Sequence, residues 1–109
     1  MREARASVFA ALGDERRLRL VDRLVAQGPV SISRLSDDAG VTRQAVTKHL
    51  RVLEGAGLAK SARQGREQLW RVEIAPLQEA ARSLEHIAQR WDVVLGRLKA
   101  ELEELAPGD

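Results

Sequence analysis

Residues 43–54 carry side chains whose types and spacing suit contact with a polyanion. At about 100° per residue of a helix, four of them fall on one arc, at i, i+3, i+4 and i+7: Gln44, Thr47, Lys48 and Arg51. Each of these side chains can form hydrogen bonds and none is acidic, whereas a helix face that is merely solvated usually mixes both signs. Gln can pair with adenine, Arg or Lys with a guanine edge, and Thr with a thymine methyl group or a phosphate. The arc therefore indicates contact with double-stranded DNA; the alternative is a generic basic surface.

Residues at the start of this helix extend the predicted contact surface. Arg43 lies in the first turn, where a recognition helix meets the groove of DNA. A cation there opposes the helix dipole, which suggests a use other than stability. The hydroxyl group of Thr42 can cap the helix and, with the first amides, hold a phosphate. We predict four base-reading residues: Arg43, Gln44, Thr47 and Arg51.

A second basic cluster lies at residues 60–66. It places three cations and no acidic side chain near one turn, which suits contact with phosphates or the minor groove. The alternative is a flexible, solvated turn. The predicted contacts to the DNA backbone are Thr42, Lys48, Lys60, Arg63, Gln64 and Arg66. Arg71 is left out, because Glu67 and Glu73 can neutralise its charge.

A pair of helices joined by a tight turn must position the arc. The apolar side chains of the helix 43–54 fall on the side opposite the arc and predict its buried face: Val46, Leu50 and Leu53. A shorter helix at 33–39 precedes it, and the turn 40–42 begins with a glycine that can take a positive φ. Two further helices come earlier, at 4–12 and after Asp14, which is a good N-cap.

A hairpin is predicted directly after this helix pair. Residues 69–74 follow the two-residue period of a strand, and a weaker strand at 58–62 with a turn at 63–66 completes the hairpin. The order of elements predicts a mainly α fold with a small β-hairpin, a winged helix–turn–helix. We expect one domain over residues 1–109, with the helix–turn–helix at about 31–56 and the wing at about 58–73.

Residues 75–105 predict an unusually long helix. Its apolar residues recur at alternating steps of four and three from Leu77 to Leu105, which is the seam of a coiled coil. At 1.5 Å per residue the helix would be roughly 45 Å long, longer than so small a domain is wide. Part of its apolar face must therefore find a surface outside its own subunit, which predicts dimerisation. The alternative is a core helix packed on its own domain.

Composition narrows the possible functions further. The chain lacks cysteine, which excludes disulfides, thiolate zinc sites and cysteine nucleophiles. Residues 43–72 carry seven basic and two acidic side chains, a net charge of +5, whereas residues 73–109 carry four and eight, a net charge of −4. A polyanion is therefore expected to bind the middle of the chain alone.

Neither membrane insertion nor catalysis is indicated by the sequence. No apolar stretch approaches the roughly 20 residues of a membrane span. The two histidines, His49 and His86, lack a nucleophile and an orienting acid around them. We expect no enzyme, no cofactor and no membrane partner, and a cytoplasmic location by default.

The chain resembles the ArsR family of bacterial winged-helix repressors along nearly its whole length. Residues 9–20, FAALGDERRLRL, are similar to the opening pattern of that family, and residues 41–58, VTRQAVTKHLRVLEGAGL, to its helix–turn–helix stretch. The resemblance implies a dimeric, sequence-specific repressor whose first and last helices, about 4–12 and 75–105, form the dimer interface. The interface residues so predicted are Val8, Phe9, Leu84, Ala88, Trp91, Leu95, Leu98 and Leu102.

Departures from the metal sensors of that family argue against metal binding. Many such sensors carry Cys-x-Cys in the third helix, where this chain reads Ser31-Ile32-Ser33. On the last helix, His86 with Glu85 or Asp92 would give an incomplete zinc site. His49 belongs to the family pattern, and we interpret it as structural rather than as a DNA or metal ligand. The residues indicate no particular inducer.

These observations predict a homodimeric repressor of transcription. Its two-fold symmetry requires an inverted-repeat operator with half-sites about one helical turn apart. The alternative is a winged-helix module that binds a protein partner through its acidic terminal helix. The basic arc would then have no purpose.

Overall fold

The computed structural model describes the backbone of residues 2–105 and the side chains of residues 6–105. Its contacts divide the chain into two units, Met1–Gln78 and Glu79–Asp109. The sequence predicts a single domain over residues 1–109. Met1 and residues 106–109 lie outside the described residues, and the assignment of one domain stays a prediction.

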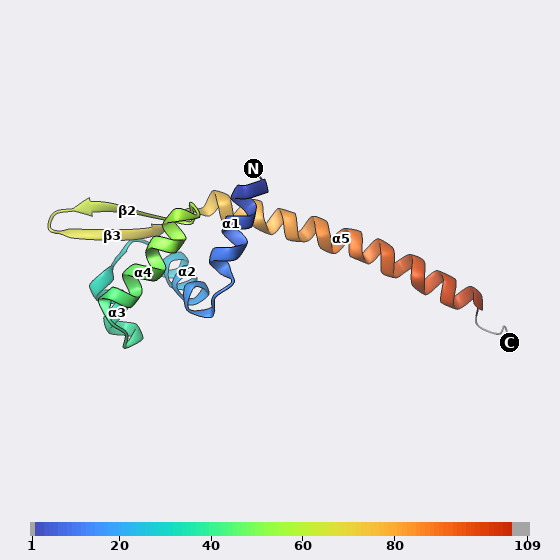
Figure 1. Ribbon diagram of the computed structural model, residues 1–109, viewed down its shortest axis with the longest axis horizontal. Coiled ribbons are helices and arrows are strands. Elements are labelled where there is room, and N and C mark those ends of the chain that lie inside the picture. Colours follow the sequence, from blue (N-terminus) through green and yellow to red (C-terminus); the bar gives the residue numbers. More distant parts are fainter. Residues whose placement is uncertain (1, 106–109) are drawn as a thin grey trace. The chain divides into compact units, whose positions relative to one another are not determined.

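The first unit alternates helices with short strands (Figure 1). Its elements are α1 (Arg2–Leu12), α2 (Glu15–Gln27), β1 (Val30–Ser31), α3 (Ile32–Ala39), α4 (Arg43–Gly55), β2 (Ala59–Gln64) and β3 (Glu67–Val72). Helix α5 (Ile74–Leu105) begins in this unit and supplies the second. The predicted mainly α winged helix–turn–helix with a long last helix is confirmed.

Side-chain caps decide where the helices begin. Asp14 accepts two backbone hydrogen bonds, at 2.8 and 3.2 Å, at the start of α2. Ser31 and Thr42 each accept one, at 3.2 and 3.1 Å, at the starts of α3 and α4. These bonds satisfy amides that have no partner within the helix. Gly40, at φ 67°, ends α3 in the left-handed conformation and allows the chain to enter α4 after two residues.

The sheet has one strand more than the sequence predicts. Strands β2 and β3 form the expected hairpin, from Ala59 opposite Val72 to Gln64 opposite Glu67. Strand β2 continues to Gln64, so the turn is residues 65–66 rather than the predicted 63–66. Strand β1 pairs with β3, with Val30 opposite Trp70, in the order β1-β3-β2. Two residues are too few to show an alternating pattern.

The core of the first unit holds one side of α4. Val46 is 2% exposed and Leu50 and Leu53 are 0% exposed, so the predicted buried face is confirmed. The other large, fully buried side chains are Leu24, Leu35, Leu58 and Trp70. Because one side of α4 is fixed in this core, the opposite side is held toward solvent.

Val8 of α1 also lies in this core. The family resemblance places it in a dimer interface, but its side chain is only 5% exposed within its own subunit. Val8 therefore has little surface left for a partner, and its main contribution is to the fold of the first unit. Phe9 is half-buried and keeps part of its surface.

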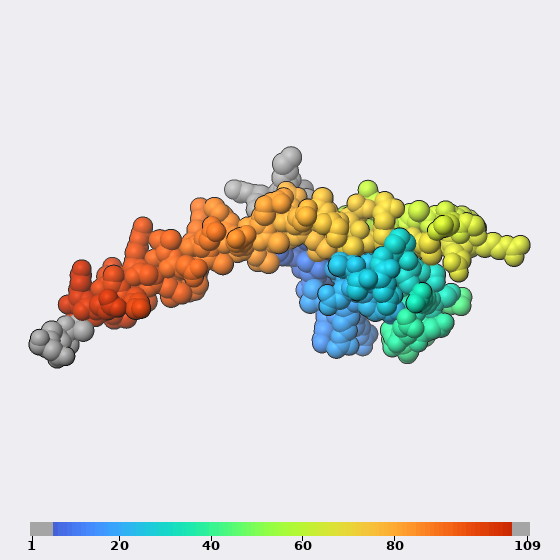
Figure 2. Space-filling view, turned by 180° about the vertical axis from the view of Figure 1, so that it is seen from behind, coloured from blue at the N-terminus to red at the C-terminus, as the bar shows by residue number. Residues whose placement is uncertain are grey.

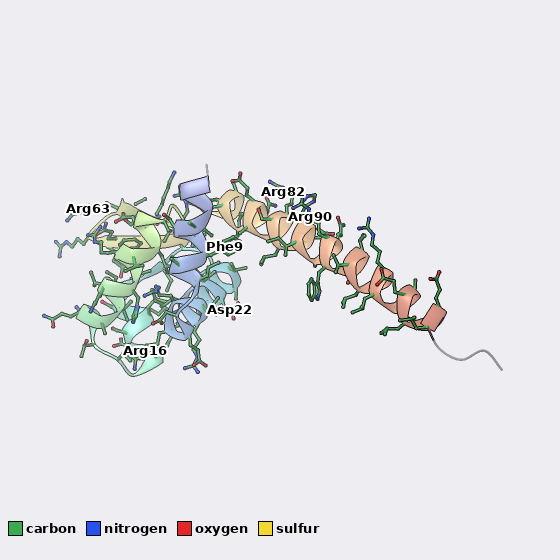
Figure 3. The ribbon with its side chains drawn as sticks, turned by 45° about the vertical axis from the view of Figure 1, so that its right-hand side comes forward. Phe9, Arg16, Asp22, Arg63, Arg82 and Arg90 are labelled. Atoms are coloured by element: carbon green, nitrogen blue, oxygen red, sulfur yellow. The ribbon has the colours of Figure 1, made fainter. Side chains whose placement is uncertain are left out.

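The second unit is a single helix with a continuous apolar stripe. Within that unit, the stripe residues have no other element to pack against, and Leu84, Trp91 and Leu98 are between 50% and 59% exposed. Arg82 and Arg90 lie together on one side of α5 (Figure 3), outside the stripe by the helical period. No helix among residues 2–105 is long and apolar enough to cross a membrane.

Candidate nucleic-acid interface

Helix α4 presents the predicted arc to solvent. Gln44, Lys48 and Arg51 are exposed and Thr47 is half-buried. The hydroxyl group of Thr47 donates a hydrogen bond to the carbonyl of Arg43 at 2.7 Å. Its methyl group and its oxygen lone pairs remain for outside contacts. The arc can thus donate and accept hydrogen bonds at once, as reading base edges requires.

Arg51 already has partners inside the protein. Its guanidinium donates to Glu54 Oε1 at 2.8 Å, and its Cζ atom lies 5.4 Å from the centre of the Trp70 ring. The side chains of Arg51 and Glu54 are 58% and 38% exposed, so the ion pair is weak and exchangeable. This pair is absent from the sequence-based prediction, although its i, i+3 spacing on a helix is a recognisable pattern.

The hairpin carries its cations outward. The side chains of Lys60, Arg63, Gln64 and Arg66 are exposed, and Figure 2 shows the hairpin, in yellow, projecting beyond the helices of the first unit. In Figure 3, Arg63 points away from those helices. Arg71 lies on the same hairpin, but its Nε donates to Glu73 Oε1 at 3.3 Å. Its charge is therefore neutralised, as the sequence suggests.

A hollow of about 330 Å³ joins the arc to the hairpin. Arg43 and Thr47 line it from α4, and Arg66 and Gln68 line it from the hairpin. One acidic residue, Glu67, also contributes. The structure thus brings predicted base-reading and backbone-contacting residues to one concave surface.

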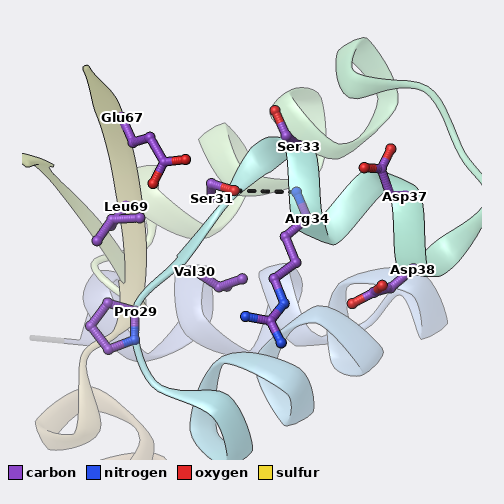
Figure 4. Close-up of a pocket in the computed structure, with 9 residues that line it drawn as sticks. All are labelled: Pro29, Val30, Ser31, Ser33, Arg34, Asp37, Asp38, Glu67 and Leu69. Carbon is purple, nitrogen blue, oxygen red and sulfur yellow. Dashed lines mark hydrogen bonds between the residues drawn. The ribbon is translucent and has the colours of Figure 1, made fainter. Parts of the chain in front are cut away.

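A second hollow, of about 400 Å³, has the opposite charge (Figure 4). It is lined by Pro29, Val30, Ser31, Ser33, Arg34, Asp37, Asp38, Glu67 and Leu69. Its lining includes three carboxylates and one guanidinium, and Asp38 is also paired with Arg23 at 2.6 Å. This surface would repel a polyanion, so it marks one border of the candidate interface.

Two arginines outside the predicted site hold the helices in place. Arg17 Nε donates to the carbonyl of Ala11 at 2.6 Å and so ties the start of α2 to the end of α1. Arg23 donates to the carbonyl of Leu35 at 3.2 Å as well as to Asp38, which ties α2 to α3. Nothing in their sequence spacing indicates these contacts, because the partners lie on other elements.

Asp14 has a clearly shifted pKa among the described acidic groups. The backbone N–H of Arg17 hydrogen-bonds its carboxylate and lowers its pKa below 3.8, with help from the N–H of Arg16 and from the charges of Arg17 and His49; partial desolvation opposes the shift. Asp14 is therefore charged over the physiological range and works as a cap.

Histidines do not assemble a metal site in the part of the chain that the structure describes. No group of three His, Asp or Glu side chains among residues 6–105 is placed to hold a metal ion. His49 is half-buried, and its Nδ1 atom is buried without a hydrogen-bond partner.

Comparisons with known proteins converge on one group. A family model described as a helix-turn-helix domain matches residues 12–62. YuzN of Bacillus subtilis (strain 168), described as an uncharacterized HTH-type transcriptional regulator, is 36% identical over 77 residues, which span 65% of this chain and 84% of that protein.

Solved structures give the same result over more of the chain. An ArsR-like transcriptional regulator from Rhodococcus sp. RHA1 is 38% identical, with a TM-score of 0.75, over 98% of this chain and 96% of that one. A homodimeric winged helix-turn-helix DNA-binding domain from Mycobacterium bovis, described as a possible ArsR-family regulator, is 26% identical, with a TM-score of 0.66, over 80% of each chain.

Proposed function

Because the chain belongs to the ArsR family of winged helix–turn–helix transcriptional regulators, we propose that it is a homodimeric repressor that binds an inverted-repeat operator. Arg43, Gln44, Thr47 and Arg51 read bases in the major groove, and Thr42, Lys48 and the hairpin cations hold the phosphates. A protein that acts on operator DNA works where the chromosome is, which in a bacterium is the cytoplasm.

One observation carries this proposal: the acid-free arc of α4 and the basic hairpin border the same hollow. Arg43 and Thr47 reach it from α4 and Arg66 reaches it from the hairpin. A duplex that places its major groove on α4 would therefore bring its backbone to the hairpin. Phosphate contacts then set the orientation, and the arc supplies the specificity.

The apolar stripe of α5 supports the homodimer. A second copy of this chain carries the same stripe, so two copies can bury it against each other in a two-fold arrangement. The Mycobacterium bovis relative is described as homodimeric. A two-fold dimer places two copies of α4 on successive turns of one DNA face, which requires an operator with inverted symmetry.

The test is binding to pooled genomic DNA fragments at two salt concentrations, about 50 and 200 mM. We expect affinity to fall steeply with salt, because bound phosphates release counterions. Replacing Arg63 and Arg66 by Ala should reduce the slope of log K against log salt by about one for each phosphate that no longer meets a cation. Arg34→Ala is the matched control, because Arg34 is also exposed but borders the acidic hollow.

The outcomes separate the two functions left open by the sequence. Salt-dependent binding that the hairpin variants weaken supports the repressor. Absence of binding at low salt, or binding indifferent to salt, would favour a protein-interaction module that uses the acidic terminal helix.

A further inference from the structure

A groove of about 240 Å³ lies behind α4, between α4 and α2. Its apolar lining comes from both helices and from the turn that leads into α4, and includes Leu20, Val41 and Val46. Leu20 and Val46 are 7% and 2% exposed, so they form a floor and not a rim. Cavities of about 150 Å³ already hold a benzene-sized molecule, so the groove has room for a small organic compound.

The charged lining of this groove has one sign. Arg16, Arg19 and Arg23 follow one another at i, i+3 and i+7 along α2, and no carboxylate lines the groove. Arg19 is paired with Glu15, and Arg23 with Asp38. The guanidinium of Arg16 has no hydrogen bond or ion pair with any residue that the structure describes. A free guanidinium beside an apolar floor suits a carboxylate attached to an apolar body.

His49 is also part of the groove and has one ring nitrogen without a partner. Its side chain lines the groove, and its Nδ1 atom is buried without a partner. A buried nitrogen without a partner costs free energy, and such atoms are uncommon in folded proteins. The imidazole of this groove-lining residue thus has hydrogen-bonding capacity that no described residue uses.

We propose that this groove binds a small organic carboxylate, with its acid group on Arg16 and its apolar part on Leu20 and Val46. The groove-lining residues of α4 are Ala45, Val46 and His49. At 100° per residue, their centre lies roughly 150° from the centre of the arc that faces DNA. A bound acid therefore does not cover the arc but sits behind α4 and changes how α4 rests on α2. The expected regulatory consequence is a change in DNA affinity. This consequence, unlike the site itself, rests on the proposed DNA binding.

Amide NMR spectra of the full-length protein test the site without DNA. The probe is sodium benzoate at constant ionic strength, with benzyl alcohol as its uncharged counterpart. We expect saturable shifts at Leu20, Ala45 and His49 with benzoate and weaker binding of the alcohol. Arg16→Ala should weaken benzoate binding about ten-fold, the loss expected for a charge-assisted hydrogen bond. Arg34→Ala, a matched exposed arginine on α3, should leave binding unchanged.

Several results would overturn the site. The first is the absence of saturable shifts with benzoate. The second is an affinity for benzyl alcohol equal to that for benzoate. The third is benzoate binding by the Arg16→Ala variant as tight as that by the unmodified protein. If Arg16→Ala weakened DNA binding while benzoate did not bind, Arg16 would be a phosphate contact instead. A second arm measures DNA affinity with and without saturating benzoate, and an unchanged affinity would remove the regulatory consequence. Failure to bind any DNA would overturn the proposed function and leave the NMR result to decide the site.

Discussion

The side chain of Arg51 needs different partners in the free protein and in the proposed complex with DNA. Without DNA, its guanidinium bonds Glu54 and lies over the Trp70 ring. With DNA, the proposed function requires it to face a guanine edge. The exchange is feasible because an exposed ion pair is worth about 1 kcal/mol or less, whereas a bidentate contact to a base discriminates by about 1–3 kcal/mol.

Replacing Arg51 by Ala should therefore weaken DNA binding by about 1–3 kcal/mol and relax the preference at one base position. Fluorescence anisotropy with duplexes that differ at single positions measures both effects. Glu54→Gln is the companion variant: it releases Arg51 and removes a negative charge, so it should strengthen binding. Equal weakening by Arg51→Ala on every duplex would make Arg51 a phosphate contact and refute its assignment to a base.

Asp14 should make the protein sensitive to acid. The lowered pKa of its carboxylate in the folded state means that the ionised form is stabilised by folding. This stabilisation is present above the unfolded pKa, near 3.8, and is lost as pH falls through the folded pKa. Urea midpoints between pH 6 and pH 2.5 should fall less steeply for Asp14→Asn, which keeps a cap without a charge. Parallel curves for the two proteins would contradict this role.

The turn before α4 depends on the backbone of Gly40. Its φ of +67° is a conformation that side chains disfavour, although nothing within 4 Å would contact an added Cβ atom. Gly40→Ala should therefore cost about 1–2 kcal/mol through backbone strain alone. Gly55→Ala is the control, because Gly55 ends α4 at an ordinary φ with the same open space. It should be neutral or stabilising.

Urea unfolding of both variants measures this difference. The prediction fails if Gly40→Ala is as stable as Gly55→Ala. A Gly40→Ala variant that folds normally yet binds DNA less well would show that the turn also sets the angle of α4.

Elements with a long, regular period could be predicted from the sequence, whereas contacts across elements could not. The buried face of α4 followed from the spacing of Val46, Leu50 and Leu53, and the caps Asp14 and Thr42 from their residue types. The two-residue strand β1 and the bonds of Arg17 and Arg23 were missed, because their partners lie on other elements. Val8 was assigned to an interface from a family resemblance, yet its burial depends on packing in three dimensions.

The arc itself was identified from residue types at helical spacing, and the structure adds what surrounds it. The hollow shared by Arg43, Thr47 and Arg66 requires the hairpin to lie beside α4. No local sequence pattern predicts this placement of the hairpin. The same holds for the groove of Arg16 and His49, whose lining residues come from α2, from the turn and from α4.

The proposed dimer depends on the apolar stripe of α5. Leu95 lies on it and is 45% exposed, while Val93 is 55% exposed on another side of the same helix. Leu95→Asp should weaken self-association at least about 100-fold, because an unpaired carboxylate would be buried between copies. Val93→Asp should leave it unchanged. Sedimentation equilibrium at micromolar concentration distinguishes the two variants. If both variants were equally dimeric, the interface would lie elsewhere.

The most direct test is selection of bound sites from random double-stranded DNA by the unmodified protein and by Gln44→Ala. The arc on α4 and the proposed two-fold dimer together predict an inverted repeat with half-sites about one helical turn apart. The Gln44→Ala variant should lose its preference at one position in each half-site, symmetrically placed, and keep it elsewhere. An identical motif for both proteins, or no shared motif in the DNA that the unmodified protein selects, would contradict the role assigned to α4.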